Sequence, residues 1–367
     1  MTSKTSERLR AEIENALGAA RIPGCSIALV DRTGLRWSAG FGFADVRREE
    51  CAHAQTVYHL FSGTKLFTAT AVVQLAERGR LSLGDALTKH LPEFALPGLT
   101  LTHLLSHTSG LKDSLRSFLA VTFPPDSLPS SSEALARYQL ASAAPPGSKV
   151  AYRNVNYALL GEVVTRASGT EFTTYVEREI LRPLGMKAAF AVDDSMRDSM
   201  ARGYIGQWDP MRLVVGLLLP NTRGRLYGET VGGLVELEEF NLATAAIGGL
   251  IGTVEDFGLF LRAHLDAGAN VISPDSTRAM QRQVASGAAG IESRVGVGLG
   301  WKIGRVDGRT FLNHEGGGAG FTSELRLYPE AGLGVALAMN AMRMPATMKL
   351  AHRLCEAVYT HRQEVTT

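Results

Sequence analysis

The chain has 367 residues, of which 45% are hydrophobic and 20% are charged, with 39 glycines and 14 prolines. This composition excludes a disordered or fibrous protein, and the length fits one large domain or two halves that share an interface. The 38 basic and 36 acidic residues leave a formal net charge of +2, too small an excess to predict a nucleic-acid partner.

The cysteine spacing and the apolar segments indicate in which cellular compartment the protein occurs. Cys25, Cys51 and Cys355 lie far apart without a C-x-x-C pair, which argues against a disulfide framework and a zinc site. The N-terminus has no apolar signal region, and the longest apolar run, residues 214–219, is far below the ~20 residues of a membrane helix. We therefore expect a cytoplasmic protein with no membrane partner, no metal and no cofactor.

Strands are predicted at both ends of the chain, with helices between them. The first part predicts an amphipathic helix, a two-stranded hairpin and a long apolar helix, at residues 6–20, 25–31, 35–43 and 62–78. The last part predicts four strands and a terminal helix, at residues 297–303, 310–314, 322–328, 334–339 and 346–359. Helical segments and loops predominate in the middle.

This order of elements predicts an α+β fold, an α/β sandwich. One antiparallel sheet from both chain termini would be flanked by helices, with a mostly helical domain inserted in the middle. We expect residues 1–85 and 266–367 to form the sheet domain and residues 86–265 an inserted all-helical domain. The active site would lie between them.

Ser62-Gly63-Thr64-Lys65, at the start of the predicted long helix, is the first candidate for chemistry. Residues i and i+3 share a helix face, so the Ser62 hydroxyl and the Lys65 amine can touch. Serine is a weak nucleophile until a base takes its proton, and a buried lysine with a lowered pKa can be that base. The helix N-terminus adds backbone N–H groups near the nucleophile.

A second S-x-x-K copy runs from Ser109 to Lys112. Gly110 predicts a turn there, so nothing would hold Lys112 in place, whereas Ser62 opens a long apolar helix. We therefore expect Ser109 to belong to the scaffold. The alternative is that both serines are only helix caps.

Two further motifs occur once each in the chain: Tyr152-Arg153-Asn154 is the only Y-x-N, and His314-Glu315-Gly316 is the only H-x-G. Glycines next to a predicted strand let a substrate approach the backbone closely. Taken singly, Tyr152 would be explained as a half-buried aromatic residue and His314 as a surface histidine.

The order S-x-x-K, Y-x-N and H-x-G resembles the superfamily of serine β-lactamases and penicillin-binding proteins, in its class C-like branch. This branch includes class C β-lactamases, D-alanyl-D-alanine carboxypeptidases, D-aminopeptidases and family VIII carboxylesterases, and the motifs are most similar to the last of these. Other stretches are also similar to the branch, at residues 101–111, 157–161, 181–186 and 248–257. The resemblance covers nearly the whole chain.

The resemblance implies a role for each matching residue. Ser62 would be the acylated nucleophile and Lys65 its hydrogen-bonded base partner. Tyr152 would carry protons between the nucleophile, the leaving group and the deacylating water, with the formal base, Lys65 or Tyr152, left open because their titrations are coupled. Asn154 would position Lys65 and a substrate carbonyl.

The resemblance also implies that the strand of the third motif, with His314 and Gly316, binds the substrate. The backbone N–H groups of Ser62 and Gly317 would form the oxyanion hole. Antibiotic-hydrolysing relatives usually have K-T-G or K-S-G here, and this chain has neither. A histidine that is mostly neutral at pH 7, followed by the anionic Glu315, supplies less positive charge for a substrate carboxylate. An uncharged ester loses little by this change.

We therefore expect a serine hydrolase that cleaves small carboxylic esters through an acyl-enzyme on Ser62, with weak or no β-lactam turnover. An amide hydrolase (β-lactamase, D-aminopeptidase or DD-peptidase type) or an acyltransferase would use the same residues, and a catalytically dead binding protein is a further alternative. Arg153 or Arg223 is a candidate for the missing positive charge. Residues 207–228 would suit an apolar substrate-binding wall or ordinary core packing. The oligomeric state is not predicted.

Overall fold

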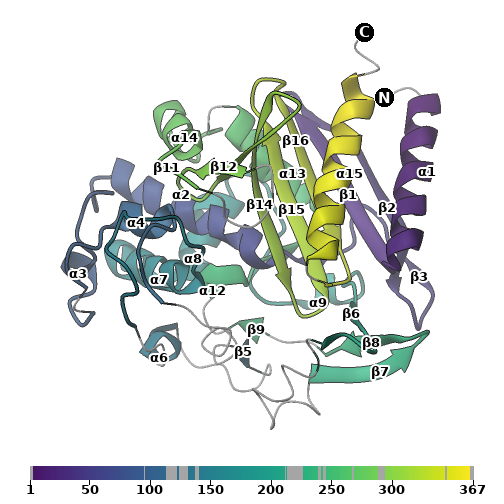
Figure 1. The fold of residues 1–367 in the computed structure, drawn as a ribbon, viewed down its shortest axis with the longest axis horizontal. Helices are drawn as coiled ribbons and strands as arrows, with labels where there is room; N and C mark the ends of the chain where they lie inside the picture. Colours follow the sequence, from purple (N-terminus) through teal and green to yellow (C-terminus); the bar gives the residue numbers. More distant parts are fainter. Residues whose placement is uncertain are drawn as a thin grey trace.

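In the computed structural model the chain folds around one large antiparallel sheet (Figure 1). The structure describes residues 3–94, 96–112, 122–123, 131–136, 140–210, 212, 226–238, 241–242, 245–266, 268–287, 294–343 and 345–363. Within them the sheet has nine strands in the order β11-β12-β13-β14-β15-β16-β1-β2-β3. Their bounds are β11 (Ala285–Ser286), β12 (Arg294–Val297), β13 (Lys302–Val306), β14 (Arg309–Gly318), β15 (Phe321–Tyr328), β16 (Leu333–Met339), β1 (Gly24–Asp31), β2 (Gly34–Asp45) and β3 (Glu50–Cys51).

The sheet joins the two ends of the chain. β1 pairs with β2 on one side and with β16 on the other, so that Ile27 lies opposite both Ala39 and Leu337. The terminal helices α1 (Ser3–Ala20) and α15 (Ala346–Gln363) lie side by side, and Nε2 of His361 is 2.9 Å from Oε2 of Glu12. The expectation of one antiparallel sheet from both termini, flanked by helices, is confirmed.

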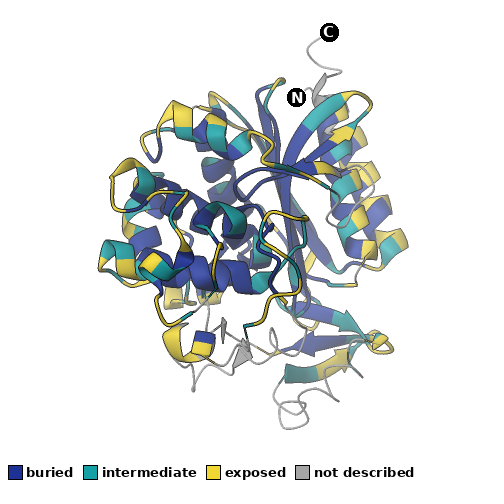
Figure 2. Cartoon of the chain, turned by 60° about the vertical axis from the view of Figure 1, so that its left-hand side comes forward, coloured by how far each residue is buried: buried dark blue, intermediate teal, exposed yellow. Residues whose placement is uncertain are grey.

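Helices cover both faces of the sheet, which explains why its central strands are buried on both sides (Figure 2). On one face Ile27 of β1 packs in the same apolar cluster as Leu9 of α1 and residues of α15. On the other face Val30 belongs to the cluster that contains Leu261 of α13 (Val254–Leu265). A Cβ at Gly258 of α13 would lie 2.9 Å from Cγ1 of Val30, so glycine is what allows this close approach.

The prediction of one strand over residues 297–303 is wrong, because a turn separates two strands there. β12 ends at Val297 and β13 begins at Lys302. Gly300, between them, has a φ of +87°, and a Cβ on it would lie 2.8 Å from Cβ of Ala69. The turn therefore packs against helix α2 (Thr64–Glu77), and Lys302 becomes the first residue of a strand.

The expectation of an all-helical insertion over residues 86–265 is also wrong. A separate sheet of β6 (Gly203–Gly206), β8 (Leu234–Leu237) and β7 (Tyr227–Val231) lies within it. Gly232 and Gly233, with φ of +58° and +82°, form the two-residue turn between β7 and β8, a Gly-Gly hairpin signal in the sequence. In addition α13 packs on the main sheet, so it belongs with the sheet domain.

The remaining elements are short apart from α7, and they include two more pairs of short strands. They are β4 (Tyr58–His59), η1 (Phe61–Gly63), α3 (Leu87–His90), α4 (Leu101–Leu105), β5 (Thr122–Phe123), α6 (Ser131–Ala136), α7 (Asn154–Ser168), α8 (Phe172–Val176), η3 (Glu177–Leu181), α9 (Asp194–Arg197), β9 (Asn241–Leu242), α12 (Ala245–Gly248), β10 (Ile251–Gly252) and α14 (Pro274–Gln281). Across the described ranges, no helix combines the length and the apolar character needed to cross a bilayer.

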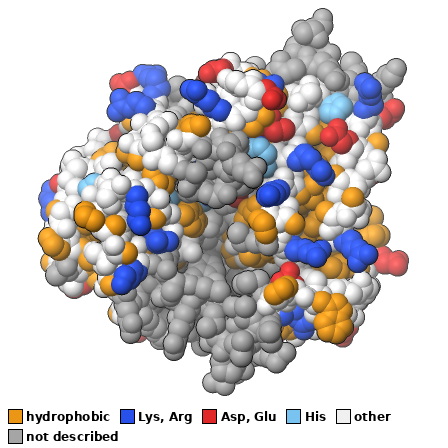
Figure 3. Space-filling model, in the orientation of Figure 1, with side chains coloured by type: hydrophobic (Ala, Val, Ile, Leu, Met, Phe, Trp, Pro, Cys, Tyr) orange, Lys and Arg blue, Asp and Glu red, His pale blue; other side chains and the backbone are white. Residues whose placement is uncertain are grey.

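Charged side chains occur in several separate groups on the face drawn in Figure 3, interspersed with hydrophobic and other side chains. Lys and Arg side chains form separate groups on this face, with Asp and Glu side chains beside some of them.

Candidate active site

Ser62 lies in the 3-10 turn η1, directly before α2. The preceding residue, Phe61, has a φ of +48°, a conformation that bulky residues rarely adopt. The Phe61 ring packs against the rings of His59 and Phe321, with centroids 5.6 and 6.4 Å away. Tertiary packing thus holds a strained backbone next to Ser62, as is common at functional sites.

The glycines of the third motif are explained by their contact with this turn. A Cβ at Gly316 would overlap the carbonyl oxygen of Leu60, and a Cβ at Gly318 would overlap the Phe61 ring. The hydroxyl of Ser323, opposite Gly316 on β15, donates to the same Leu60 oxygen at 2.7 Å. Strand β14 therefore packs directly on the turn that carries Ser62, which requires glycine at both positions.

Lys65 is fully buried and touches Ser62, as the i to i+3 spacing predicts. Its Nζ donates to Ser62 Oγ at 2.9 Å and to the backbone oxygen of Ile247 at 2.7 Å. Helix α12, which carries Ile247, is held to α2 by a 2.8 Å hydrogen bond from Thr68 Oγ1 to the oxygen of Ala246. The position of Lys65 Nζ is thus fixed by two separate elements.

Tyr152 lies just before α7, and its ring faces the groups of all the other motifs. The Nζ atoms of Lys65 and Lys302 are 5.3 and 4.8 Å from the centre of the ring. The rings of His107 and His314 have centroids 4.5 and 6.0 Å from it. The structure therefore brings the S-x-x-K, Y-x-N and H-x-G motifs together around one aromatic ring.

The second S-x-x-K copy takes part in a hydrogen-bonded scaffold beneath this ring. Ser109 Oγ donates to Asn156 Oδ1 at 2.7 Å, and Asn156 Nδ2 lies 3.2 Å from His107 Nδ1. The backbone N–H of Arg153 donates to the same His107 nitrogen at 3.2 Å. Lys112 is exposed, while Ser109 is buried. This geometry agrees with a scaffold role for Ser109.

His107 is held in its neutral form. Burial lowers its pKa well below the ordinary range, and the positive charges of Lys65, Lys302 and Arg153 act in the same direction. Because Nδ1 accepts the backbone N–H, the proton of the neutral ring is on Nε2. The ring therefore supports Tyr152 through packing and adds no charge to the site.

Lys302 is the residue of this site that sequence reasoning missed. It is buried and donates from Nζ to Oε2 of Glu315 at 2.8 Å. It enters from β13, the strand next to the third motif, where it lies opposite Asn313. Its only signal in the sequence is a lysine directly after the buried Trp301, in a stretch of mostly apolar residues and glycines.

Arg153 and Arg223 were the sequence candidates for a positive charge that binds a substrate carboxylate. The Arg153 side chain donates to the backbone oxygens of Leu111 and Tyr152 at 2.9 and 3.1 Å, so it holds the loop. Arg223 lies outside the described residues, as does most of the segment 207–228 that was considered as a substrate-binding wall.

The remaining predicted residues lie at the edges of the site. Asn154 is the half-buried first residue of α7, two residues after Tyr152. His314 is fully buried and its Nδ1 is 2.8 Å from the backbone oxygen of Glu315. Gly317 is half-buried, whereas its neighbours Gly316 and Gly318 are buried. Gly317 is thus the glycine of this strand with the most exposed backbone.

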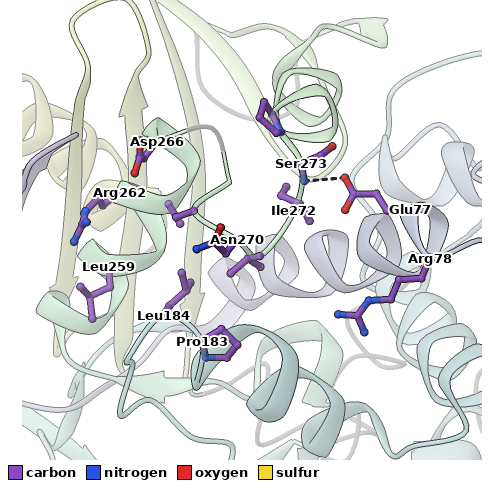
Figure 4. Close-up of a pocket in the computed structure, with 14 residues that line it drawn as sticks. Glu77, Arg78, Pro183, Leu184, Leu259, Arg262, Asp266, Asn270, Ile272 and Ser273 are labelled. Atoms are coloured by element: carbon purple, nitrogen blue, oxygen red, sulfur yellow. Dashed lines mark hydrogen bonds between the residues drawn. The ribbon is translucent and has the colours of Figure 1, made fainter.

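A cavity of about 820 Å³ lies elsewhere, between the end of α2, helix α13 and the loop before α14 (Figure 4). Glu77 and Arg78 lie on the opposite side of the cavity from Arg262, with Asn270 between them, and Glu77 accepts a 2.8 Å hydrogen bond from the backbone N–H of Ser273. None of the candidate catalytic residues lines this cavity. It is therefore separate from the site around Ser62.

A family model described as Beta-lactamase matches residues 9–358, a range that includes every candidate residue named above. The chain belongs to the beta-lactamase family. This is a family of serine hydrolases, so the family supports an enzyme whose nucleophile is a serine.

Curated proteins are similar to this chain over half or more of its length. Penicillin-binding protein 4 of Amycolatopsis lactamdurans is 30% identical over 308 residues, which are 78% of this chain and 72% of that protein. Protein flp of Staphylococcus aureus (strain NCTC 8325 / PS 47) is 26% identical over 373 aligned residues, 99% of this chain and 68% of that protein. In strain MW2 the match is 33% identical over 193 residues, 51% of this chain, and it spans only 38% of the relative.

Solved structures have the same fold. The octameric penicillin-binding protein homologue from Pyrococcus abyssi has a TM-score of 0.80 and 26% identity, over 96% of this chain and 77% of that one. The D-amino acid amidase from Ochrobactrum anthropi SV3, complexed with L-phenylalanine amide, also has a TM-score of 0.80, with 21% identity over 98% of this chain and 100% of that one. The likeness to the amidase concerns the fold alone.

Proposed function

We propose that the protein is a hydrolase of uncharged carboxylic esters that works through an acyl-enzyme on Ser62. The observation that carries this proposal is the charge at the third motif: Lys302 is paired with Glu315 at 2.8 Å, next to the buried His314. The pair sums to zero, so the motif offers a substrate carboxylate no net positive charge. β-Lactams and D-alanyl peptides carry such a carboxylate, whereas a simple ester does not.

In the proposed reaction Ser62 Oγ attacks the ester carbonyl and its proton passes to the Lys65–Tyr152 pair. Lys65 already contacts Ser62 Oγ at 2.9 Å, and Tyr152 lies beside Lys65. The backbone N–H groups of Ser62 and Gly317 would stabilise the oxyanion. The C–O bond of the ester then breaks, and the leaving alcohol takes the proton. Water attacks the acyl-enzyme by the reverse proton path and releases the acid and free Ser62.

The test compares p-nitrophenyl butyrate with a chromogenic cephalosporin. We expect rapid ester cleavage that is lost in Ser62→Ala and largely retained in the matched variant Ser109→Ala, together with slow cephalosporin turnover. Cephalosporin turnover as fast as ester turnover would contradict the ester preference. A dead Ser109→Ala with an active Ser62→Ala would reverse the choice between the two S-x-x-K copies.

An amide hydrolase with the same nucleophile is the second candidate. It is favoured by the 30% identity to a penicillin-binding protein, a class named for an amide-containing ligand. D-Phenylalanine amide and p-nitroanilides would then turn over faster than the matched esters, with the same loss in Ser62→Ala. Acyl transfer is tested in the ester assay, where added alcohols would give a transfer product. A fluorophosphonate probe that fails to label Ser62 would instead indicate a catalytically dead binding protein.

The cytoplasm is the proposed compartment. All three cysteines are free thiols, and Cys51 is exposed. An exposed free thiol persists in a reducing compartment, whereas an oxidising one favours disulfide formation. Fractionation of the native host, followed by detection of the protein, tests this assignment.

A further inference from the structure

We propose that Glu315 sets the charge selectivity of the site: it holds the ammonium group of Lys302 and thereby excludes substrates that carry a carboxylate. This inference rests on the proposed hydrolysis of uncharged esters, and it explains the preference for uncharged substrates by the Glu315–Lys302 ion pair. It assigns Glu315 and Lys302 the role of specificity determinants.

The first step of the argument is the place of Lys302 in the sheet. Strand β13 pairs with β14 from Arg309 to Asn313, and Lys302 is opposite Asn313 at the end of this pairing. In the described part of the chain, residues 314–318 of β14 continue past β13. Lys302 therefore lies where an edge of the third-motif strand opens, and its side chain reaches along that edge to Glu315.

The second step is the distance to the reacting groups. Lys302 Nζ is 4.8 Å from the centre of the Tyr152 ring, and Lys65 Nζ, which contacts Ser62 Oγ, is 5.3 Å from the same centre. The two Nζ atoms are thus at most about 10 Å apart, and both lie close to the Tyr152 ring. A substrate that acylates Ser62 and spans this separation brings its carboxylate to Lys302.

The third step is the competition for the ammonium group. Glu315 and Lys302 are 5% and 8% exposed, so their attraction is weakly screened by water. A substrate carboxylate that approaches Lys302 must share the ammonium group with Glu315, and it meets the negative charge of Glu315 as it approaches. Another anion, Glu324, lies opposite Glu315 on β15 and is already bonded to Asn313 and Arg326. Glu315 is therefore the group that decides whether Lys302 is available.

A purely structural ion pair between neighbouring strands is the competing explanation, and substrate charge separates the two. The matched probes are p-nitrophenyl butyrate, which is neutral, and p-nitrophenyl hydrogen succinate, which has the same acyl length and a terminal carboxylate. A chromogenic cephalosporin adds a carboxylate on the leaving-group side. The quantity compared is the ratio of kcat/KM for an anionic probe to kcat/KM for the neutral ester, because loss of stability or of general activity cancels in it.

In Glu315→Gln we expect this ratio to rise by about tenfold or more for at least one anionic probe, the scale of a charge-assisted hydrogen bond. The double variant Glu315→Gln/Lys302→Met should lose that gain. An unchanged ratio for both anionic probes, or a gain that persists without Lys302, would overturn the inference.

A thermal melt shows whether Glu315→Gln folds. If it does not, Lys302→Met alone tests whether the ion pair sets substrate selectivity. It leaves Glu315 as an uncompensated anion, so the ratio should fall below that of the wild type, and an unchanged ratio would refute the role of the pair. The wild-type rate on p-nitrophenyl butyrate tests the proposed function separately. If the wild type cleaves only amides, the same ratios are measured with the p-nitroanilides of butyric and succinic acids.

Discussion

Gly161→Ala offers a test of how α12 positions Lys65. Gly161 lies in the middle of α7, where a Cβ would stand 2.5 Å from Cβ of Ala246 on α12. Carbon atoms in good contact are about 3.5 to 4.0 Å apart, so the two helices must separate by about 1 Å. The neighbouring Ile247 carries the oxygen that accepts from Lys65 Nζ at 2.7 Å, and this bond lengthens with the shift.

Two opposing effects set the stability of this variant. Alanine in place of glycine in a helix interior gains about 1 kcal/mol, and overpacking costs about 1 to 3 kcal/mol. The net change is therefore a loss of at most about 2 kcal/mol, a shift of only a few degrees in Tm for a chain of 367 residues. Turnover should suffer more, because a misplacement of about 1 Å in a catalytic arrangement costs about 10²-fold.

The assay is kcat for p-nitrophenyl butyrate together with a thermal melt. Gly18→Ala is the matched control, because Gly18 also lies in a helix, α1, and a Cβ there would meet no atom within 4 Å. We expect the control to keep full turnover and a Tm at or above that of the wild type. Wild-type turnover in Gly161→Ala, with a raised Tm, would refute the argument that α12 positions Lys65.

The remaining predictions concern one catalytic group, one buried ion pair and one buried histidine. Tyr152→Phe should lower kcat by about 10²-fold or more with little change in Tm, and near-normal turnover would remove Tyr152 from the reaction. Arg326→Met leaves Glu324, fully buried beside it, without its cation, and should cost about 3 to 5 kcal/mol in chemical denaturation, whereas a change below 1 kcal/mol would contradict this. Burial lowers the pKa of His264 from 6.5 to about 3, so the unfolded chain binds this proton first and stability is lost as pH falls below about 6.5. In His264→Phe the loss between pH 7 and pH 5 should be about 2 kcal/mol smaller, and parallel pH profiles of the two proteins would refute it.

The sequence predicted those helices and strands whose pattern of apolar residues matches their burial in the fold. β1 and β16 are mostly apolar runs because helices cover both of their faces. The break between β12 and β13 was missed because the run of apolar residues continues through Gly298 and Gly300, and only the contact with α2 makes the chain turn there. The β7–β8 hairpin was missed although its Gly-Gly turn is a recognised signal.

In the active site, too, contacts between residues close in sequence could be predicted, whereas contacts that depend on the fold could not. The contact between Ser62 and Lys65 follows from helix geometry over three residues, so the sequence alone predicts it. Tyr152 and His314 reach the same place only through the fold, and their motifs pointed to it through a family resemblance. Lys302 could not be predicted, since its proximity to Glu315 depends on the register between β13 and β14.

The central position of β1 has a consequence for biosynthesis. This strand leaves the ribosome early, yet one of its two neighbours, β16, is about 300 residues away, as in the pair Cys25 and Met339. Until β16 has been translated, one edge of β1 has no strand to pair with and is a template for wrong pairing with other chains. β14, which packs on the turn of Ser62, is also translated late. The sheet therefore closes only after β16 has been translated, and nascent chains need protection from aggregation until then.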